Sequence, residues 1–122
     1  MRATVLIVDD EHMLLALFAE ALSDRYEVLV APCVADGIAL LKQHVVHLVV
    51  TDLNCGMDNG LDLLRWIEHD RPGLLATSFV LSGDYDPDME GFEVPVITKP
   101  INLEQLRAVF ASALEAAELP QT

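Results

Sequence analysis

The chain has 122 residues, a length that suits one domain built around one hydrophobic core. Hydrophobic residues make up 52% of the chain, which is too many for a disordered protein. The formal net charge is −13 and only seven residues are Lys or Arg, so direct binding to nucleic acid is not expected.

Neither the apolar runs nor the cysteines indicate an exported or membrane protein. No apolar run approaches the roughly 18 residues of a membrane span. The opening "MRATVLIVDD" has a short apolar segment that ends in two acids, unlike a secretory signal. Cys33 and Cys55 form neither a disulfide framework nor a metal-binding pattern. We therefore expect a cytoplasmic protein with two reduced, partly buried thiols and no membrane contact.

The first half of the chain alternates between short apolar segments and amphipathic ones. Residues 4–10 are predicted to form a strand that ends in two acids, and residues 12–24 a helix whose apolar side includes Leu17. A second strand at 26–31 and a second helix at 34–44 are predicted next.

The second half continues the alternation through a third strand, a third helix, two further strands and a last helix. These are residues 47–52, 60–70, 74–83, 94–100 and 102–119, the last with Asn102 as N-cap. Residues 84–93 contain a Pro, a Gly and five acids but no apolar stripe, so at most one helical turn is predicted there. Strands that are apolar on both faces and alternate with helices predict one open α/β domain over 1–122, with a parallel sheet covered on both sides.

Polar residues follow four of the five predicted strands. Asp9 and Asp10 end the first strand, Asp52 the third, Ser82 the fourth and Lys99 the fifth. Any one of these residues, taken alone, could simply be a helix cap or a solvated strand end. In an open parallel sheet, however, ligands bind at the carboxyl ends of the strands, and all four ends meet at that edge.

This set of side chains indicates phosphoryl chemistry. Carboxylates that converge repel one another, so we expect a hard cation among them, and Mg²⁺ favours carboxylates together with phosphate oxygens and water. A lysine can pair with one phosphoryl oxygen, and a serine hydroxyl can donate to another. Asp52 could then act as a nucleophile on phosphorus and form an acyl phosphate.

Five short motifs closely resemble the receiver domain of two-component response regulators, which is similar in fold to the chemotaxis regulator. They are "LIVDDE", "VVTDLN", "NGLDLL", "LSG" and "TKP", in order and at suitable spacing over nearly the whole chain. The resemblance implies a flavodoxin-like strand order of 2-1-3-4-5 with helices on both faces. Here the fourth helix is expected to be short or missing.

The resemblance also implies a role for each site residue. Asp52 resembles the phosphorylated aspartate, and Ser82 and Lys99 the residues that contact the phosphoryl group. The other matching positions are Asp9 and Asp10 as Mg²⁺-site acids, Asn54 as a metal ligand through its backbone carbonyl, Gly83 as the small residue that keeps the site open, and a cis Lys99–Pro100 bond.

Three departures from the family pattern concern the surroundings of the site. Gly56 stands where the family commonly has Pro, so a more flexible loop is expected before phosphorylation. Val96 stands where the family commonly has a switch Tyr or Phe. Only sixteen residues, 83–98, separate Ser82 from Lys99, which agrees with the missing helix. We expect intact phosphorylation chemistry and an unusual output surface.

The leading hypothesis is a phosphoacceptor module that catalyses only its own phosphorylation and dephosphorylation. A histidine kinase or histidine phosphotransfer protein would donate to Asp52, and binding of a downstream protein, or of a second copy in a homodimer, would change. The alternative is a pseudo-receiver that binds proteins without phosphorylation. A third hypothesis, a phosphatase with an aspartyl nucleophile, usually requires Asp-x-Asp, whereas this chain has Asp-x-Asn at Asp52.

The acidic segment after the fourth predicted strand and the last six residues each have two possible interpretations. The spacing of Asp84, Asp86 and Asp88 suggests a calcium loop, but Met89 and Pro95 occupy the sixth and twelfth positions, where Gly and Glu are required. A solvated acidic loop is the better interpretation. The final "AELPQT" is consistent with either the natural end of the domain or the start of a linker.

Overall fold

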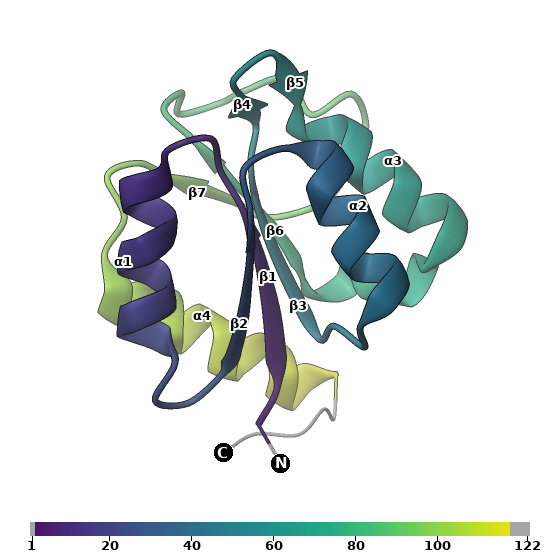
Figure 1. Ribbon diagram of the computed structural model, residues 1–122. Helices are drawn as coiled ribbons and strands as arrows, with labels where there is room; N and C mark the ends of the chain where they lie inside the picture. Colours follow the sequence, from purple (N-terminus) through teal and green to yellow (C-terminus); the bar gives the residue numbers. More distant parts are fainter. Residues whose placement is uncertain (1, 118–122) are drawn as a thin grey trace.

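A computed structural model describes residues 2–117, which form a five-stranded parallel sheet between two layers of helices (Figure 1). The strands of this sheet are β1 (Thr4–Val8), β2 (Glu27–Ala31), β3 (Leu48–Asp52), β6 (Ser78–Ser82) and β7 (Val96–Thr98). The helices are α1 (His12–Leu22), α2 (Val34–Gln43), α3 (Gly60–Asp70), the 3₁₀ helix η1 (Pro72–Thr77) and α4 (Leu103–Ala116).

The strand order is β2-β1-β3-β6-β7, with every neighbouring pair parallel. This confirms the predicted order 2-1-3-4-5, because β4 (Asn54–Cys55) and β5 (Asp58–Asn59) form a separate two-stranded hairpin. Helices α1 and α4 cover one face of the sheet and α2 and α3 the other (Figure 1). No helix of the described part of the chain is both long enough and apolar enough to cross a membrane.

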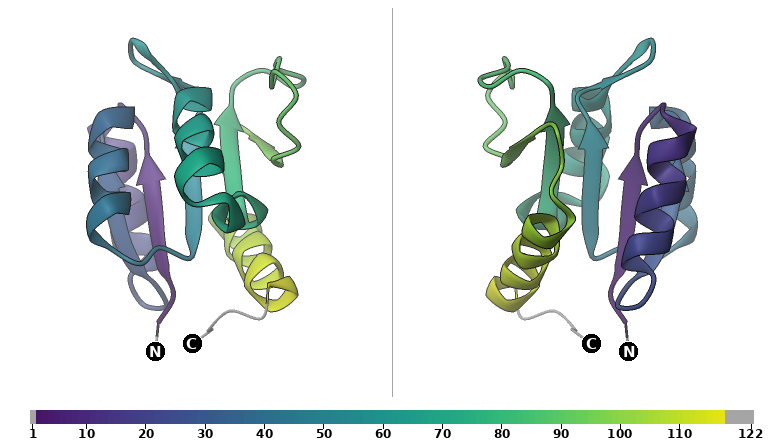
Figure 2. Two further views of the ribbon diagram at one scale, coloured as in Figure 1. Left: turned by 90° about the vertical axis from the view of Figure 1, so that its right-hand side faces the viewer. Right: turned by 90° about the vertical axis from the view of Figure 1, so that its left-hand side faces the viewer.

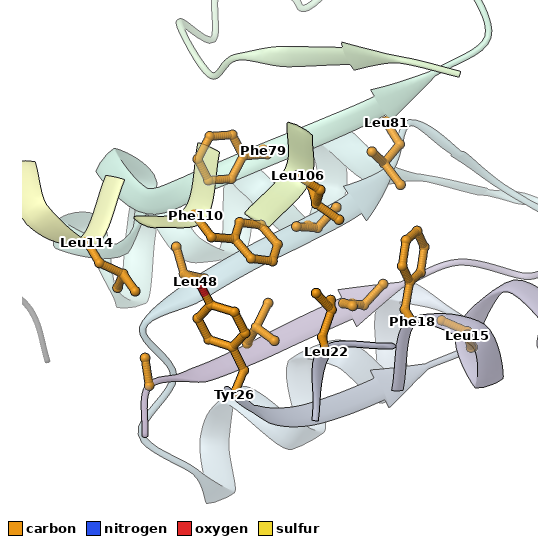
Figure 3. Packing of buried hydrophobic residues seen from close by; sticks show 14 residues of the cluster. Leu15, Phe18, Leu22, Tyr26, Leu48, Phe79, Leu81, Leu106, Phe110 and Leu114 are labelled. Atoms are coloured by element: carbon orange, nitrogen blue, oxygen red, sulfur yellow. The ribbon is translucent and has the colours of Figure 1, made fainter. Parts of the chain in front are cut away.

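The core on the α1/α4 face is organised around Phe110 of α4. Its ring meets Tyr26 edge to face at a centroid distance of 5.6 Å and lies 6.1 Å from the ring of Phe79 (Figure 3). Phe18 and Leu22 of α1 complete the same buried cluster. Aromatic pairs of this geometry contribute about 0.5–1.5 kcal/mol each beyond their buried area, so they hold α4 against the sheet.

The α2/α3 face has its own core, built from the alternate residues of the same central strands. Strand residues Leu6, Val49 and Val80 pack there against Leu64 and Ile67 of α3. Because both faces are buried, the central strands read as continuous apolar runs rather than alternating ones. This is the property of the sequence from which the parallel sheet was predicted.

Helix bounds agree closely with the sequence-based expectations. Asn59 caps α3 by accepting a hydrogen bond from Leu61 N at 2.9 Å, and Asn102 caps α4 by accepting one from Gln105 N at 3.1 Å. The expectation for Leu17 was wrong, because this side chain is 51% exposed. The predicted continuation of the last helix to residue 119, and most of the "AELPQT" segment, lie outside the described residues.

The predicted strand at 74–83 was wrong in its first half. Residues 72–77 form η1, and β6 begins only at Ser78. The hydroxyls of Thr77 and Ser78 both donate to the carbonyl of Leu74, which tightens this turn. Local side-chain bonds of this kind compete with strand pairing, and the apolar Leu74–Leu75 pair packs against the core without entering the sheet.

No helix lies between β6 and β7 in the described residues, as predicted for the acidic segment 84–93 (Figure 2). The segment is nevertheless attached to the domain. Met89 and Phe92 pack against the α2/α3 core, and Glu90 pairs with Arg65 of α3 at 2.7 Å. A loop with apolar anchors therefore takes the place of the helix.

The β4–β5 hairpin was not predicted, since residues 53–59 were interpreted as a Gly-rich loop. Asn54 pairs with Asn59 and Cys55 with Asp58, and Gly56 in the turn has a φ of +63°. Proline cannot adopt this φ, which explains why glycine occupies the position where the family commonly has Pro.

Gly60 is required for the chain to pass close to Asp52. A Cβ atom at Gly60 would lie 2.2 Å from the carbonyl oxygen of Asp52. We predict that Gly60→Ala lowers the free energy of unfolding by about 1–3 kcal/mol, because the backbone of β3 must shift. Urea denaturation checks this. Gly73→Ala is the control, since its Cβ would meet nothing within 4 Å; equal stability of the two variants would contradict the explanation.

Candidate functional site

The carboxyl ends of β1, β3, β6 and β7 bring the predicted site residues to one edge of the sheet. Val8 pairs with Thr51, Asp52 with Leu81, and Ser82 with Thr98. Asp9 and Lys99 immediately follow β1 and β7. The register therefore places these side chains at neighbouring strand ends, as the sequence predicted.

Three carboxylates converge at this edge. One oxygen each from Asp9, Asp10 and Asp52 lies within 4.8 Å of the others. Asp9 and Asp52 are buried, whereas Asp10 is exposed to solvent. Like charges at this separation repel, so the cluster favours a cation and could hold a metal ion with hard oxygen ligands.

Asp9 has one oxygen satisfied and the other without a partner. Oδ1 accepts a hydrogen bond from Glu11 N at 2.9 Å, while the buried Oδ2 has no hydrogen-bond partner among the described residues. Burial raises the pKa of the Asp9 carboxyl, and the charge of Asp52 adds to this effect. A buried, unpaired carboxylate oxygen is costly, and it is the kind of group that a bound cation satisfies.

Lys99 supplies the positive charge next to the acids. Its Nζ donates to Asp52 Oδ2 at 3.0 Å and lies 3.7 Å from Asp9 Oδ2. Burial acts to lower the pKa of the Lys99 ammonium, but the hydrogen bond to Asp52 and the charges of Asp52 and Asp9 outweigh it, so the pKa is raised. Lys99 is therefore a permanent cation across the physiological pH range.

The two oxygens of Asp52 have different partners. Oδ2 accepts from Lys99, and Oδ1 accepts from the backbone N–H of Asn54 at 3.2 Å. These contacts orient the carboxylate at the mouth of the acid cluster. The alternative interpretation of Asp52 as a simple helix cap does not fit, because Asn59 caps α3 instead.

Ser82 is buried at the end of β6, the strand next to Asp52. Its Oγ accepts from the backbone N–H of Asp84 at 3.0 Å, and its carbonyl accepts from Lys99 N at 2.8 Å. The next residue, Gly83, is exposed, and a Cβ there would meet nothing within 4 Å. A larger residue at position 83 would therefore meet no steric obstacle from the rest of the described structure.

The remaining predicted positions lie around β7. The Lys99–Pro100 peptide bond is cis, as the resemblance implied. Val96 is half-buried and borders a groove of about 380 Å³ between β7 and α4, together with Phe79 and Leu106. A branched aliphatic side chain thus stands where the family commonly has an aromatic switch residue, as the sequence indicated.

Cys55 lies near the acids but is chemically inert. It is 2% exposed, and burial together with the nearby Asp10 and Asp52 raises the pKa of its thiol to about 12. The reactive form of cysteine is the thiolate, which is negligible here at neutral pH. This supports the interpretation of Cys55 as a small buried filler.

Sequence reasoning missed Asp58, whose side chain leaves the hairpin and contacts α2. Its Oδ2 accepts a hydrogen bond from Val34 N at 3.0 Å. A carboxylate between Met57 and Asn59 looks like an ordinary turn residue. No local pattern could have linked it to a helix 24 residues earlier in the chain.

Comparison with known proteins agrees with this geometry. The sequence profile of the response regulator receiver domain matches residues 5–111. The chain belongs to this family. Its five-stranded parallel sheet is that of the receiver domains of two-component systems.

Among curated proteins, this receiver domain is similar to the alginate biosynthesis transcriptional regulatory protein AlgB of Pseudomonas aeruginosa. The two are 32% identical over 119 residues, which cover 94% of the domain and 26% of AlgB. It is also similar to the polar-differentiation response regulator DivK of Brucella ovis, at 24% identity over 93% of the domain and 98% of DivK. The chain thus spans about a quarter of the length of the AlgB relatives it matches.

Solved structures show the same fold. The signal receiver domain of an HD domain-containing protein from Pseudomonas fluorescens superposes with a TM-score of 0.85 and 25% identity, covering 97% of this receiver domain and 98% of that chain. NtrX from Brucella abortus matches with a TM-score of 0.84 and 28% identity, covering 97% of the domain and 28% of NtrX.

The buried charge of Asp9, whose Oδ2 accepts no hydrogen bond, leads to a stability prediction for the receiver domain. We expect Asp9→Asn to raise the free energy of unfolding by about 1–2 kcal/mol in metal-free buffer at neutral pH, because a buried repulsive charge is removed. Thermal unfolding measures the change. Asp86→Asn, in the exposed acidic loop, is the control with the same change in charge.

The pH dependence follows from the raised pKa. The pKa of Asp9 is raised in the folded protein, so the contribution of Asp9 to stability falls as the pH rises from its unfolded pKa of about 4 through its folded pKa. The advantage of Asp9→Asn should therefore shrink as the pH is lowered from 7 towards 4. An advantage that is equal at both ends of this range would contradict the assignment of the effect to Asp9 ionisation.

Proposed function

We propose that the chain is a phosphoacceptor domain that receives a phosphoryl group on Asp52. The donor would be a phosphohistidine on a partner histidine kinase or histidine phosphotransfer protein. The observation that carries this proposal is the placement of the Asp52 carboxylate next to Lys99, at 3.0 Å, and next to the two acids that follow β1. A nucleophilic oxygen, a fixed cation and a metal-binding acid pair are thus adjacent.

In the proposed transfer, a carboxylate oxygen of Asp52 attacks phosphorus. The oxygen–phosphorus bond forms as the bond between phosphorus and the donor imidazole nitrogen breaks, and the product is an acyl phosphate. Lys99 already lies within hydrogen-bond distance of Asp52 Oδ2. Its ammonium can then hydrogen-bond to a phosphoryl oxygen instead and balance the negative charge that arrives with the phosphoryl group.

Asp9, Asp10 and Asp52, with the backbone carbonyl of Asn54, would hold a Mg²⁺ ion. The donor set fits this ion, since it consists of oxygens and includes the unsatisfied Asp9 Oδ2. When bound, Mg²⁺ would offset the repulsion between the carboxylates and the incoming phosphoryl oxygens. The chain's own residues orient the nucleophile.

Ser82 completes the proposed phosphoryl site. Its Oγ accepts a hydrogen bond from Asp84 N, which leaves the hydroxyl proton available for donation to a phosphoryl oxygen. We propose that the domain catalyses only its own phosphorylation and hydrolysis, and that the phosphorylated form binds a downstream protein differently.

A phosphorylation-independent binding module is the second candidate function. The observation that favours it is Val96, which cannot hydrogen-bond or reorient as an aromatic switch residue would. The intact arrangement of Asp52, Ser82 and Lys99 favours the phosphoacceptor over this alternative. The two functions make opposite predictions for covalent modification.

The test is intact mass after incubation with Mg²⁺ and a small acyl-phosphate donor. We predict one added phosphoryl group on the wild-type chain and none on Asp52→Asn. Lys99→Ala should be labelled roughly tenfold or more slowly, because a preorganised charge near the transferring group is lost. Asp62→Asn, an exposed residue of α3, should be labelled like the wild type.

Two results would contradict the phosphoacceptor proposal. The first is equal labelling of wild type and Asp52→Asn, which would place the acceptor elsewhere. The second is no labelling of the wild type together with no Mg²⁺-dependent binding of fluoroberyllate, a mimic of the phosphoryl group. The second result would support the binding module.

A further inference from the structure

The β4–β5 hairpin lies between the acid site and the beginning of α2. It projects above the carboxyl edge of the sheet, beside the amino ends of α2 and α3 (Figures 1 and 2). Its two strands are only two residues long, so pairing within the hairpin contributes little stability of its own. Contacts with the rest of the domain must hold it in place.

The first of these contacts is a helix cap supplied from a distant segment. The N-cap residue of α2, Cys33, makes no side-chain cap hydrogen bond in the described structure. Instead, Asp58 Oδ2 accepts from the N–H of Val34, the first residue of α2, at 3.0 Å. A carboxylate here both satisfies a free helical N–H and interacts favourably with the helix dipole.

The second contact joins the other strand of the hairpin to the same loop. The thiol of Cys55 donates to the carbonyl oxygen of Pro32 at 3.3 Å. The hairpin is thus attached to the β2–α2 connection at two points.

The opposite side of the hairpin contacts the acid site directly. Asn54 N donates to Asp52 Oδ1 at 3.2 Å, and a Cβ at Gly56 would lie 3.5 Å from Asp10 Oδ2. Residues 54–59 therefore hydrogen-bond to Asp52 on one side and to the start of α2 on the other, and the turn at Gly56 passes close to Asp10.

We propose that Asp58 is a positioning residue that couples occupancy of the acid site to the first turn of α2. Its hydrogen bond to Val34 holds the hairpin so that Asn54 remains beside Asp52. A ligand of the acid site that orders Asn54 then strengthens the Asp58–Val34 hydrogen bond. By thermodynamic linkage, loss of that hydrogen bond lowers the affinity for the ligand by the same factor by which the ligand favours the hydrogen bond.

This inference rests on the proposed function only for the identity of the ligand, Mg²⁺ followed by a phosphoryl group. It gives the domain a route for signal output that uses neither an aromatic switch at Val96 nor a helix between β6 and β7. The strengthened hydrogen bond would order the first turn of α2, where Ala35 and Asp36 are exposed and could contact a partner protein.

The test compares Asp58→Ala with Asp58→Asn and with Asp62→Ala. Both substitutions at Asp58 remove one negative charge, but asparagine keeps an oxygen that can accept from Val34 N. Asp62→Ala removes the same charge from an exposed position on α3. The measurements are calorimetric titration with Mg²⁺ alone and hydrogen exchange of the Val34 amide with and without Mg²⁺.

We expect Mg²⁺ to bind Asp58→Ala roughly threefold to tenfold more weakly than wild type, while Asp58→Asn stays within about twofold. Mg²⁺ should slow exchange at Val34 in wild type and in Asp62→Ala, and have no effect on it in Asp58→Ala. Equal Mg²⁺ affinity of wild type and Asp58→Ala would overturn the coupling. Equal weakening by alanine and asparagine would also overturn it, since charge alone would then explain the loss.

Failure of this inference can be distinguished from failure of the proposed function. If the wild-type chain is phosphorylated on Asp52 but Asp58→Ala binds Mg²⁺ normally, the coupling alone is wrong. If the wild-type chain binds neither Mg²⁺ nor a phosphoryl group, the proposed function fails before any variant is compared.

Discussion

The close approach of three carboxylates at one edge of a parallel sheet is the constraint on which the site depends. Asp9, Asp10 and Asp52 would repel one another without compensation, and Lys99 supplies only one positive charge for the three. The resulting deficit is visible in the unpaired Oδ2 of Asp9 and in its raised pKa. This arrangement costs the domain some stability at this edge, and a hard cation bound among the carboxylates would offset that cost.

The fold tolerates this arrangement because apolar cores on both faces of the sheet bury the central strands. One core is centred on Phe110 and the other on Leu64 and Ile67, and both pack against the central strands along their length. The strands can therefore end in charged groups without loss of packing. Gly60 and the cap at Asn59 then turn the chain sharply after Asp52, so that α3 begins beside the site without covering it.

The helix bounds and the grouping of the site residues could be predicted because each depends on local patterns, whereas the strand order was implied by the resemblance to receiver domains. A buried parallel strand is an apolar run, and the polar residue after it falls at a known edge. The η1 turn was missed because Leu74 and Leu75 look like strand residues, although Ser78 and Thr77 bond back to Leu74. The Asp58–Val34 contact was missed because it joins residues far apart in sequence, and two-residue strands leave no periodic signal.

The central claim is that the acid cluster is a specific cation site and not merely part of an acidic surface. Titration of the isotopically labelled chain with Mg²⁺, followed by backbone amide shifts, tests it most directly. The account predicts saturable shifts concentrated at residues 9–11 and 52–56 that disappear in Asp52→Asn. Shifts that do not saturate, or that are centred on the acidic loop at 84–93, would contradict it.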